Sequence, residues 1–164
     1  MARWLVKSDP ETYAYADLER DGTTEWDGVH NAQALIHLRT MRPGDGLLFY
    51  HSGEERAVVA LAEVTSDPHP DPKDTRRSWS MAIRPVRPLR GPVPLSELRA
   101  DRKLEGWVLF RMSRLSVMPV TDAQWGAVLA HEPKGAAAPP TAAPKGRARA
   151  SGSRPRGASA RRTR

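Results

Sequence analysis

The chain has 164 residues, of which 39% are hydrophobic and 27% charged, and its formal net charge is +7. This length predicts a single domain with a real core, and no apolar run approaches the roughly 18–20 residues of a membrane-spanning helix. Cysteine is absent, which excludes disulfides and thiolate metal sites. The N-terminus is too short and too quickly charged for a secretory signal, so we expect a cytoplasmic protein without a membrane partner.

The positive charge belongs to the C-terminal end of the chain. Residues 133–164 contain nine Lys or Arg and no Asp or Glu, whereas residues 1–132 hold 17 basic and 19 acidic side chains, a net of −2. Apart from proline, that end has no apolar residue larger than alanine, so it cannot offset the entropy of ordering. We therefore predict a folded domain over 1–132 and a disordered basic tail over 133–164.

The first part of the chain predicts one strand and two helices. Residues 3–7 are rich in aromatic and branched side chains, and residues 15–20 form a short helix that ends near a glycine. A polar connector, residues 23–27, leads into a helix over 31–41 that begins with a good capping residue. Its buried face is predicted from four apolar positions: Leu35, Ile36, Leu38 and Met41.

The middle of the chain predicts a hairpin. A strand over 47–52 is joined by a short loop to a strand over 57–64, which is apolar on both faces and therefore central. Residues 67–77 are expected to form a loop with no ladder, because three prolines fall within six residues. The next strand begins at Trp79 and places Met81 on the same face.

The C-terminal part predicts two helices and a strand. A brief helix over 96–100 and an apolar segment whose type the pattern leaves open precede a strand over 115–120. A capping box at 121–124 then opens the final helix. About five strands and four short helices, without regular βαβ crossovers, indicate an α+β fold: a small bent sheet or barrel flanked by helices.

The stretch from Trp26 to Ala34 combines an aromatic ring, a glycine turn and a helix start. The unpaired N–H groups of a helix N-terminus favour acceptor atoms and anions, so a flat, polar-edged ligand such as a nucleobase suits this corner. Trp26 lies in a polar connector, which is unusual for a core residue, so we favour ligand contact there. Trp79 suits a base clamp and a core position equally, whereas Trp4 and Trp125 lie in apolar stripes and are expected in the core.

Four polar side chains near these rings have suitable chemistry, each with a plainer alternative. Asn31 and Gln33 carry donors and acceptors, as reading a base edge requires, although Asn31 is also a helix cap. Lys7 is suited to contact a phosphate, and its plainer alternative is a solvated position at the end of a strand. Ser8 is suited to donate to a ring nitrogen of a base, and its plainer alternative is a structural role in a turn.

Six motifs are spaced along residues 3–131: WLVKSDP, WDGVHNAQA, MRPGD, FYHS, WSM and RLSVMPV. In this order they resemble the EVE domain family. The resemblance implies a PUA-like fold, a small bent β-barrel with flanking helices, related to the YTH readers of methylated adenine. It also implies a non-catalytic module for modified bases in DNA or RNA, with nucleic acid as the partner and with no cofactor.

The resemblance further implies where the site lies. Trp26 and Asn31 would line a base pocket with Trp79 opposite, and the end of the first strand would lie beside it. The remaining implied contacts to the base and to phosphate are Ser8, Gln33, Tyr50, His51, Ser52, Lys7 and Arg114. The chain reads HNAQAL at 30–35 where the family usually has RNYQAR, so one aromatic and two arginines are missing. A wider pocket and weaker phosphate contact are expected there.

Two other functions compete with this one. A small hydrolase would use His51 and Ser52, but neighbours on a strand point to opposite faces and the sequence places no carboxylate to orient His51. In a protein-interaction module, the tail alone would bind nucleic acid by counterion release. A metal site is not expected, because His30 and His37 are seven residues apart and a helical metal pair needs three or four.

Overall fold

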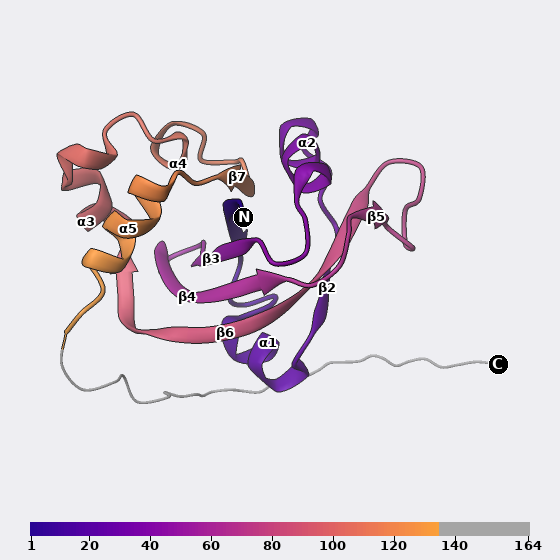
Figure 1. The fold of residues 1–164 in the computed structure, drawn as a ribbon, viewed down its shortest axis with the longest axis horizontal. Coiled ribbons are helices and arrows are strands. Elements are labelled where there is room, and N and C mark those ends of the chain that lie inside the picture. Colours follow the sequence, from indigo (N-terminus) through magenta and orange to yellow (C-terminus); the bar gives the residue numbers. More distant parts are fainter. Residues whose placement is uncertain (135–164) are drawn as a thin grey trace.

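The computed structural model describes residues 1–134, whose strands form one curled sheet of order β2-β6-β4-β3-β1-β7, with β5 paired to β6 (Figure 1). The strands are β1 (Arg3–Ser8), β2 (Thr24–Trp26), β3 (Gly46–His51), β4 (Ala57–Val64), β5 (His69–Pro70), β6 (Trp79–Pro94) and β7 (Val117–Pro119). The helices are α1 (Tyr15–Asp21), α2 (Ala32–Thr40), α3 (Leu95–Ala100), α4 (Val108–Arg111) and α5 (Asp122–Ala130), with a 3-10 turn at Arg102–Leu104. The predicted α+β class is confirmed.

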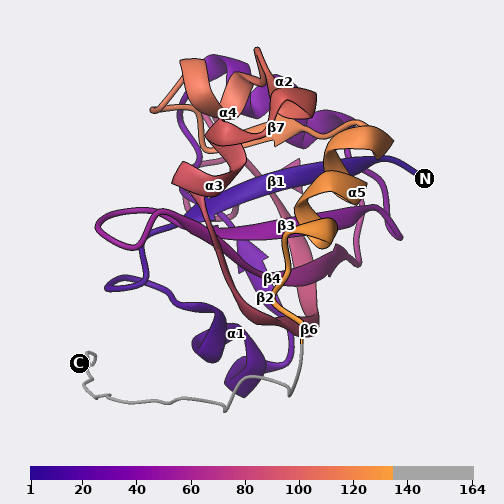
Figure 2. The ribbon, with the colours of Figure 1, turned by 90° about the vertical axis from the view of Figure 1, so that its left-hand side faces the viewer.

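The sheet mixes one parallel pair with antiparallel neighbours. Strands β1 and β3 run parallel, with Lys7 opposite Tyr50 and Ser8 opposite His51, so both strands end at the same edge. Figure 2 shows β1, β3 and β4 side by side. The predicted central position of β4 is confirmed, because it lies between β3 and β6. The register between β4 and β6 shifts twice, and such bulges increase local twist, which fits the strong bend of the long strand β6.

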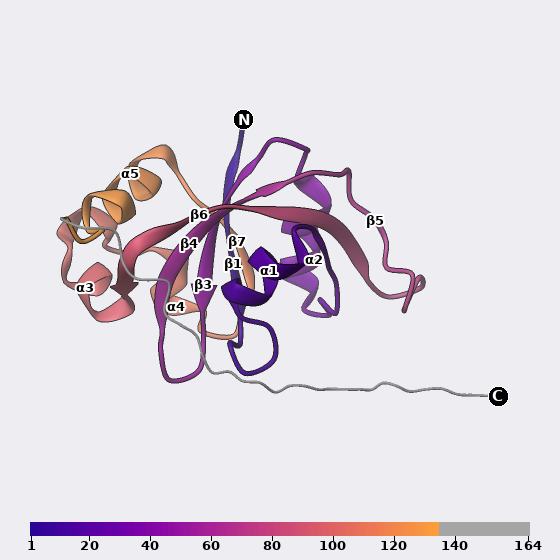
Figure 3. The ribbon, with the colours of Figure 1, turned by 90° about the horizontal axis from the view of Figure 1, so that it is seen from below.

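The helices cover two sides of the sheet. Helices α3, α4 and α5 gather on one side, and α1 and α2 lie on the other (Figures 1 and 3). On the first side Trp125 packs so closely on Gly46 that a Cβ there would come within 2.9 Å of the indole ring. No helix among residues 1–134 is long and apolar enough to cross a membrane. The cytoplasmic location stays a prediction.

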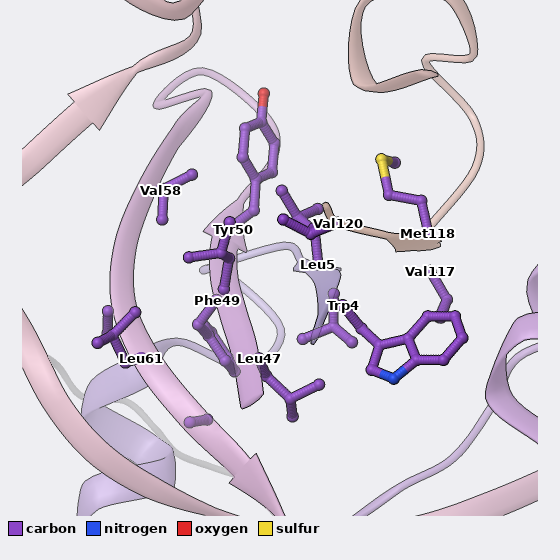
Figure 4. Close-up of a cluster of buried hydrophobic side chains, with 14 of the residues drawn as sticks. Trp4, Leu5, Leu47, Phe49, Tyr50, Val58, Leu61, Val117, Met118 and Val120 are labelled. Carbon is purple, nitrogen blue, oxygen red and sulfur yellow. The ribbon is translucent and has the colours of Figure 1, made fainter. Parts of the chain in front are cut away.

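The core fills both sides of β3. Figure 4 shows the rings of Phe49 and Tyr50 leaving this strand in opposite directions, as neighbouring residues of a strand do. Trp4 is buried as predicted, and its indole N–H donates to the Asp45 carboxylate at 3.0 Å. Asp45 is 4% exposed and also accepts the N–H groups of Ala2 and Arg42 at 3.0 and 2.9 Å. This carboxylate therefore ties the N-terminus to the turn before β3.

Several local predictions were wrong. Residues 24–26 form strand β2 rather than an irregular connector, because they pair with β6. The proline loop contains a short ladder, in which His69 and Pro70 pair with the start of β6. Proline is tolerated there because β5 pairs on one side alone, which leaves its missing N–H outside the ladder. Ile36 is 58% exposed, and the buried face of α2 consists of Ala34 and Leu38.

Two further segments complete the comparison with the predictions. The apolar stretch whose type was open includes the short helix α4. The tail predicted over 133–164 lies outside the described residues, apart from its first two. The division into a domain and a tail therefore stays a prediction.

Candidate functional site

The loop before α2 is held by the segment between β5 and β6. Gly28 has a φ of +73°, which L side chains rarely adopt, and its N–H donates to Asp71 at 3.3 Å. Ser78 is fully buried and donates its hydroxyl to the Val29 carbonyl at 2.6 Å. The backbone N–H of Lys73, with that of Gly28, holds the pKa of the Asp71 carboxyl below its usual range against the opposing effect of burial. The start of α2 thus depends on residues more than forty positions later.

Asn31 caps α2. Its side-chain oxygen accepts the N–H of Ala34 at 3.0 Å, which confirms the capping role. The side chain is exposed, and its amide nitrogen is recorded in no hydrogen bond within residues 1–134. Gln33 is also exposed, with its amide nitrogen 3.2 Å from the His37 ring. Both amides therefore lie on the surface at the start of the helix.

Trp26 belongs mostly to the core. It is 9% exposed and packs edge-on against Phe49, with ring centroids 5.7 Å apart. Polar neighbours in the sequence led us to predict ligand contact at Trp26. Side chains along β2 alternate between the two faces, so Glu25 points to the opposite face from Trp26. A ligand can reach this ring only where the small exposed part remains.

Trp79 is the more accessible ring. It is half-buried at the start of β6, and the Arg39 guanidinium lies 4.6 Å from its ring centroid. Arg39 belongs to the last turns of α2, so this contact joins the helix to the start of β6. Sequence reasoning missed it, because neither the spacing nor the motifs pair these two residues.

The ends of β1 and β3 divide the predicted site between two faces of the sheet. His51 contacts Phe49 at 5.8 Å between ring centroids and shares its face with Ser8 and Trp26. Lys7 and Tyr50 lie on the other face, with the Lys7 ammonium 5.6 Å from the Tyr50 ring centroid. The residues implied for one pocket therefore do not all converge.

His51 is held by hydrogen bonds at both ring nitrogens. Its Nε2 accepts the N–H of Tyr15 at 3.1 Å, so the ring proton is on Nδ1 and is donated to Glu55 at 2.8 Å. The expectation that no carboxylate orients His51 was wrong. Because both nitrogens are used internally, neither has a lone pair available to a substrate in this arrangement.

The two serines at this edge serve the backbone. Ser8 is 9% exposed and donates its hydroxyl to the carbonyl of Tyr13 at 2.5 Å. Ser52 donates its backbone N–H to the Ser8 carbonyl at 2.9 Å and so extends the pairing of β1 with β3 by one residue. These contacts support the turn alternative for Ser8.

Lys7 and Arg114 lie on the same side of the molecule. The Lys7 ammonium donates to the carbonyl of Ser113 at 2.9 Å, next to Arg114 in the chain. Desolvation by burial lowers the pKa of Lys7. Arg114 is exposed.

A polar cluster that the sequence did not reveal joins β2, β5 and β6. His69 is hydrogen-bonded to the Glu25 carboxylate through Nε2 and to the Asp67 carbonyl through Nδ1, at 3.1 Å for the latter. Ser80, which is fully buried, donates to the same Glu25 oxygen at 2.6 Å. The Asp67 carbonyl, followed by Glu25, raises the pKa of His69. When both ring nitrogens of His69 are protonated, each faces an acceptor and the ring forms an ion pair with Glu25 between strands.

Two hollows mark the surface. One of ≈ 390 Å³ is lined by Arg99, Ala100, Asp101, Arg102, Glu105, Gly106 and Phe110. The other, of ≈ 330 Å³, is lined by Asp9, Pro10, Glu11, Ser52, Gly53, Glu54 and Glu55. Neither contains Trp26, Asn31 or Trp79. Within the described part of the chain, no group of three or more His, Asp or Glu is arranged to hold a metal ion.

A curled mixed sheet with helices on both sides defines a PUA-like domain. Residues 2–131 match the model of the EVE domain, and the chain belongs to the EVE domain family.

Named relatives agree with this membership. The chain is 32% identical to human thymocyte nuclear protein 1, and the match covers 81% of this chain and 75% of that protein. An NMR structure of a Rhodopseudomonas palustris protein superimposes with a TM-score of 0.77 at 36% identity, covering 80% of this chain and 93% of that one. Human THYN1 in complex with DNA containing 5-methylcytosine superimposes with a TM-score of 0.75 at 28% identity, covering 83% of this chain and 100% of that one.

Proposed function

We propose that this EVE domain binds nucleic acid that carries a modified base, without catalytic turnover. The observation that carries the proposal is the human relative in complex with DNA containing 5-methylcytosine, whose chain is covered in full at a TM-score of 0.75. DNA is the nucleic acid of that complex, and RNA is the alternative that the test below separates.

The base in this proposal stacks beside the start of α2. Trp79 is the accessible ring, and Trp26 lies in the core with little of its surface exposed. Arg39 must leave the Trp79 ring before a base can stack there. Stacking contributes about 1–3 kcal/mol per base, and an exposed cation–π contact about 0.5–1 kcal/mol, so the exchange is favourable. The amides of Asn31 and Gln33 would supply hydrogen bonds to the base edge.

Ser8, His51 and Ser52 support this site rather than contact the base. Their hydrogen bonds hold the ends of β1 and β3 together, next to Tyr15 and the loop before α1. Lys7 and Arg114 contribute positive charge for phosphate.

The absence of turnover in the proposal is supported by the state of the serine and histidine side chains. His51 has both ring nitrogens engaged, and Ser52 is its neighbour at the end of a strand. The Ser80–His69–Glu25 cluster has the composition of a hydrolytic triad, and His69 Nε2 lies 3.2 Å from the Ser80 hydroxyl, but Ser80 is 0% exposed and donates to Glu25. A nucleophile needs access to substrate and a general base to take its proton.

The test is a binding titration of the full chain with matched DNA and RNA oligonucleotides that contain 5-methylcytosine or cytosine. Trp79→Leu should reduce affinity and discrimination, whereas Trp79→Phe keeps an aromatic face and should retain most of both. Asn31→Ser is a matched probe, because serine caps a helix as well as asparagine and adds no charge but lacks the amide donors, and it should reduce discrimination. Equal affinity of the natural chain for modified and plain oligonucleotides, in DNA and RNA alike, would contradict the proposal.

A chain that ends at residue 132 tests the share of the tail. The two solved relatives described above have 93% and 100% of their own chains covered by the match, so the fold forms without a comparable tail. Removal of nine cations should weaken binding to every oligonucleotide alike and flatten its salt dependence. If discrimination disappears with the tail, the domain is a protein-interaction module instead.

A further inference from the structure

Lys7 lies beside Tyr50 on the face of the sheet that Trp26 does not occupy, and Arg56 and Arg99 are near enough for their charges to act on its hydroxyl. Lys7 lies 5.6 Å from the Tyr50 ring centroid and is anchored by its hydrogen bond of 2.9 Å to Ser113. Arg56 precedes β4, and its carbonyl accepts the N–H of Leu95 at 2.8 Å, which places it beside the start of α3. Arg99 extends from that helix over the Phe110 ring, 5.4 Å from its centroid. We call Lys7, Tyr50, Arg56 and Arg99 the Tyr50 cluster.

The hydroxyl of Tyr50 is a donor that the fold does not use. Tyr50 is 3% exposed, yet its hydroxyl is recorded in no hydrogen bond among residues 1–134. The oxygen is not sealed in the core, because Trp107 Nε1 is the single enclosed side-chain nitrogen or oxygen without a partner in that range. Burial raises the pKa of Tyr50, although the charges of Arg56 and Arg99 oppose this, so the phenol keeps its proton. A buried ring thus presents an O–H group at the surface between cations.

The three cations lack carboxylate partners. None of them takes part in a salt bridge within the described residues, whereas five other Lys or Arg side chains of that range do so. The neighbouring carboxylate of Glu55 is bonded to His51. These three side chains therefore bring positive charge near the Tyr50 hydroxyl without a direct ion pair, although Asp101 and Glu105 line the same hollow as Arg99.

Arg56 occupies a strained position. Its φ of +44° makes it the one residue other than glycine with a positive φ in residues 1–134. Glycine adopts this conformation without steric cost, so backbone geometry favours glycine over arginine here. Residues held in such sparsely populated conformations cluster at functional sites.

We propose that the Tyr50 cluster binds a backbone phosphate of nucleic acid. Lys7, Arg56 and Arg99 supply charge, and the Tyr50 hydroxyl donates to a phosphate oxygen. The inference rests on the proposed function for its ligand, but it moves Tyr50 from the base to the phosphate. Because β1 and β3 end at one edge of the sheet, a nucleic-acid strand that crosses this edge contacts the Tyr50 cluster on one face and the side of Ser8 on the other.

The experiment measures the affinity of the full chain for single-stranded DNA with 5-methylcytosine or cytosine at several salt concentrations. Arg56→Gly and Arg99→Gln should each weaken binding several-fold and reduce the salt slope by about 0.7. Both effects should be equal for the two oligonucleotides. Tyr50→Phe should weaken binding about 3- to 10-fold with the salt slope unchanged, because it removes a hydrogen bond and no charge.

Two control variants test position and charge. Arg20→Gln on α1 changes the net charge by the same amount at a distant exposed site, where Arg20 is paired with two aspartates. It should leave the slope nearly unchanged. Arg56→Lys should restore most of the affinity that Arg56→Gly loses.

Three outcomes would overturn the inference. The first is an unchanged slope in both Arg56→Gly and Arg99→Gln. The second is an equal loss in Arg20→Gln. The third is a loss of discrimination between the two oligonucleotides in Tyr50→Phe, which would show that Tyr50 contacts the base and not the phosphate.

A second probe separates this inference from the proposed function. Titration of the full chain with inorganic phosphate should shift the NMR resonances of the Tyr50 ring, and Arg56→Gly should abolish the shift. If the natural chain binds no oligonucleotide but shows this shift, the anion site stands and the nucleic-acid function fails. If it shows neither, both are wrong.

Discussion

The two faces of the curled sheet treat their polar groups in opposite ways. On the face of Trp26, the polar side chains of Ser8 and His51 are bonded to the chain itself and hold strands and loops in place. On the face of Tyr50, the hydroxyl makes no hydrogen bond and the three cations form no salt bridge within residues 1–134, although Lys7 and Arg99 donate to the backbone carbonyls of Ser113 and Phe110. Groups that the fold satisfies act as structure, whereas charges that it leaves without an ion pair are available to a ligand. Mutations on the first face should therefore change stability, and mutations on the second should change binding.

Trp26→Ala should have the largest effect. Trp26 is 9% exposed, and its ring packs on the ring of Phe49. Truncation of a core tryptophan costs about 3–5 kcal/mol in the free energy of unfolding, which urea denaturation followed by circular dichroism would measure. A cost below about 1 kcal/mol would show that the ring serves a ligand and not the core.

His51→Ala should come second. It removes the acceptor for the buried N–H of Tyr15 and the donor to Glu55. An unsatisfied buried donor costs about 1–3 kcal/mol in the free energy of unfolding. The same denaturation experiment measures this loss, and the salt dependence of DNA binding should not change. A variant of natural stability would argue that His51 is available for chemistry.

Arg56→Gly should raise the free energy of unfolding, whereas the first two variants lower it. Relief of the positive φ should raise the free energy of unfolding by about 1 kcal/mol, less the entropy that glycine adds to the unfolded chain. Binding to DNA should weaken in the same variant. A rise in the free energy of unfolding with a fall in DNA affinity would separate the role of the Arg56 side chain from that of its backbone. A fall in both quantities would show no such separation.

The His69 cluster should produce the smallest effect, visible as a dependence on pH. The folded pKa of His69 is raised, so its stabilising contribution is complete below the ordinary value of about 6.5 and is lost as the pH rises through the folded value. The side chain is 40% exposed, so the contribution should stay below about 1 kcal/mol. Denaturation of the natural chain and of His69→Gln between pH 5 and 9 should show a decline in the first and not in the second.

Much of the fold could be predicted because its signals are local. Capping residues fixed the starts of α2 and α5, and the apolar strand β4 was expected at the centre of the sheet, as observed. The predictions failed where pairing with a distant strand overrides local preference. Strand β2 and the ladder of Pro70 exist because β6 lies beside them, and nothing in residues 24–26 or 67–77 indicates that neighbour.

The candidate site was predictable in composition and not in arrangement. The motifs identified Lys7, Ser8, Tyr50 and His51, but alternation along β1 and β3 sends them to opposite faces. The Arg39–Trp79 contact and the partner of His51 lay beyond the reach of motif reasoning. Each depends on which side chains meet after folding.

The sequence by itself determined the family, the α+β class and the residue types available for a base and a phosphate. These follow from motif order, periodicity and composition, which the chain carries without reference to its fold. Tertiary structure alone decided which polar groups are satisfied internally and which are left for a partner. That distinction depends on contacts between residues far apart in the chain, such as Arg56 with Leu95 and Gly28 with Asp71.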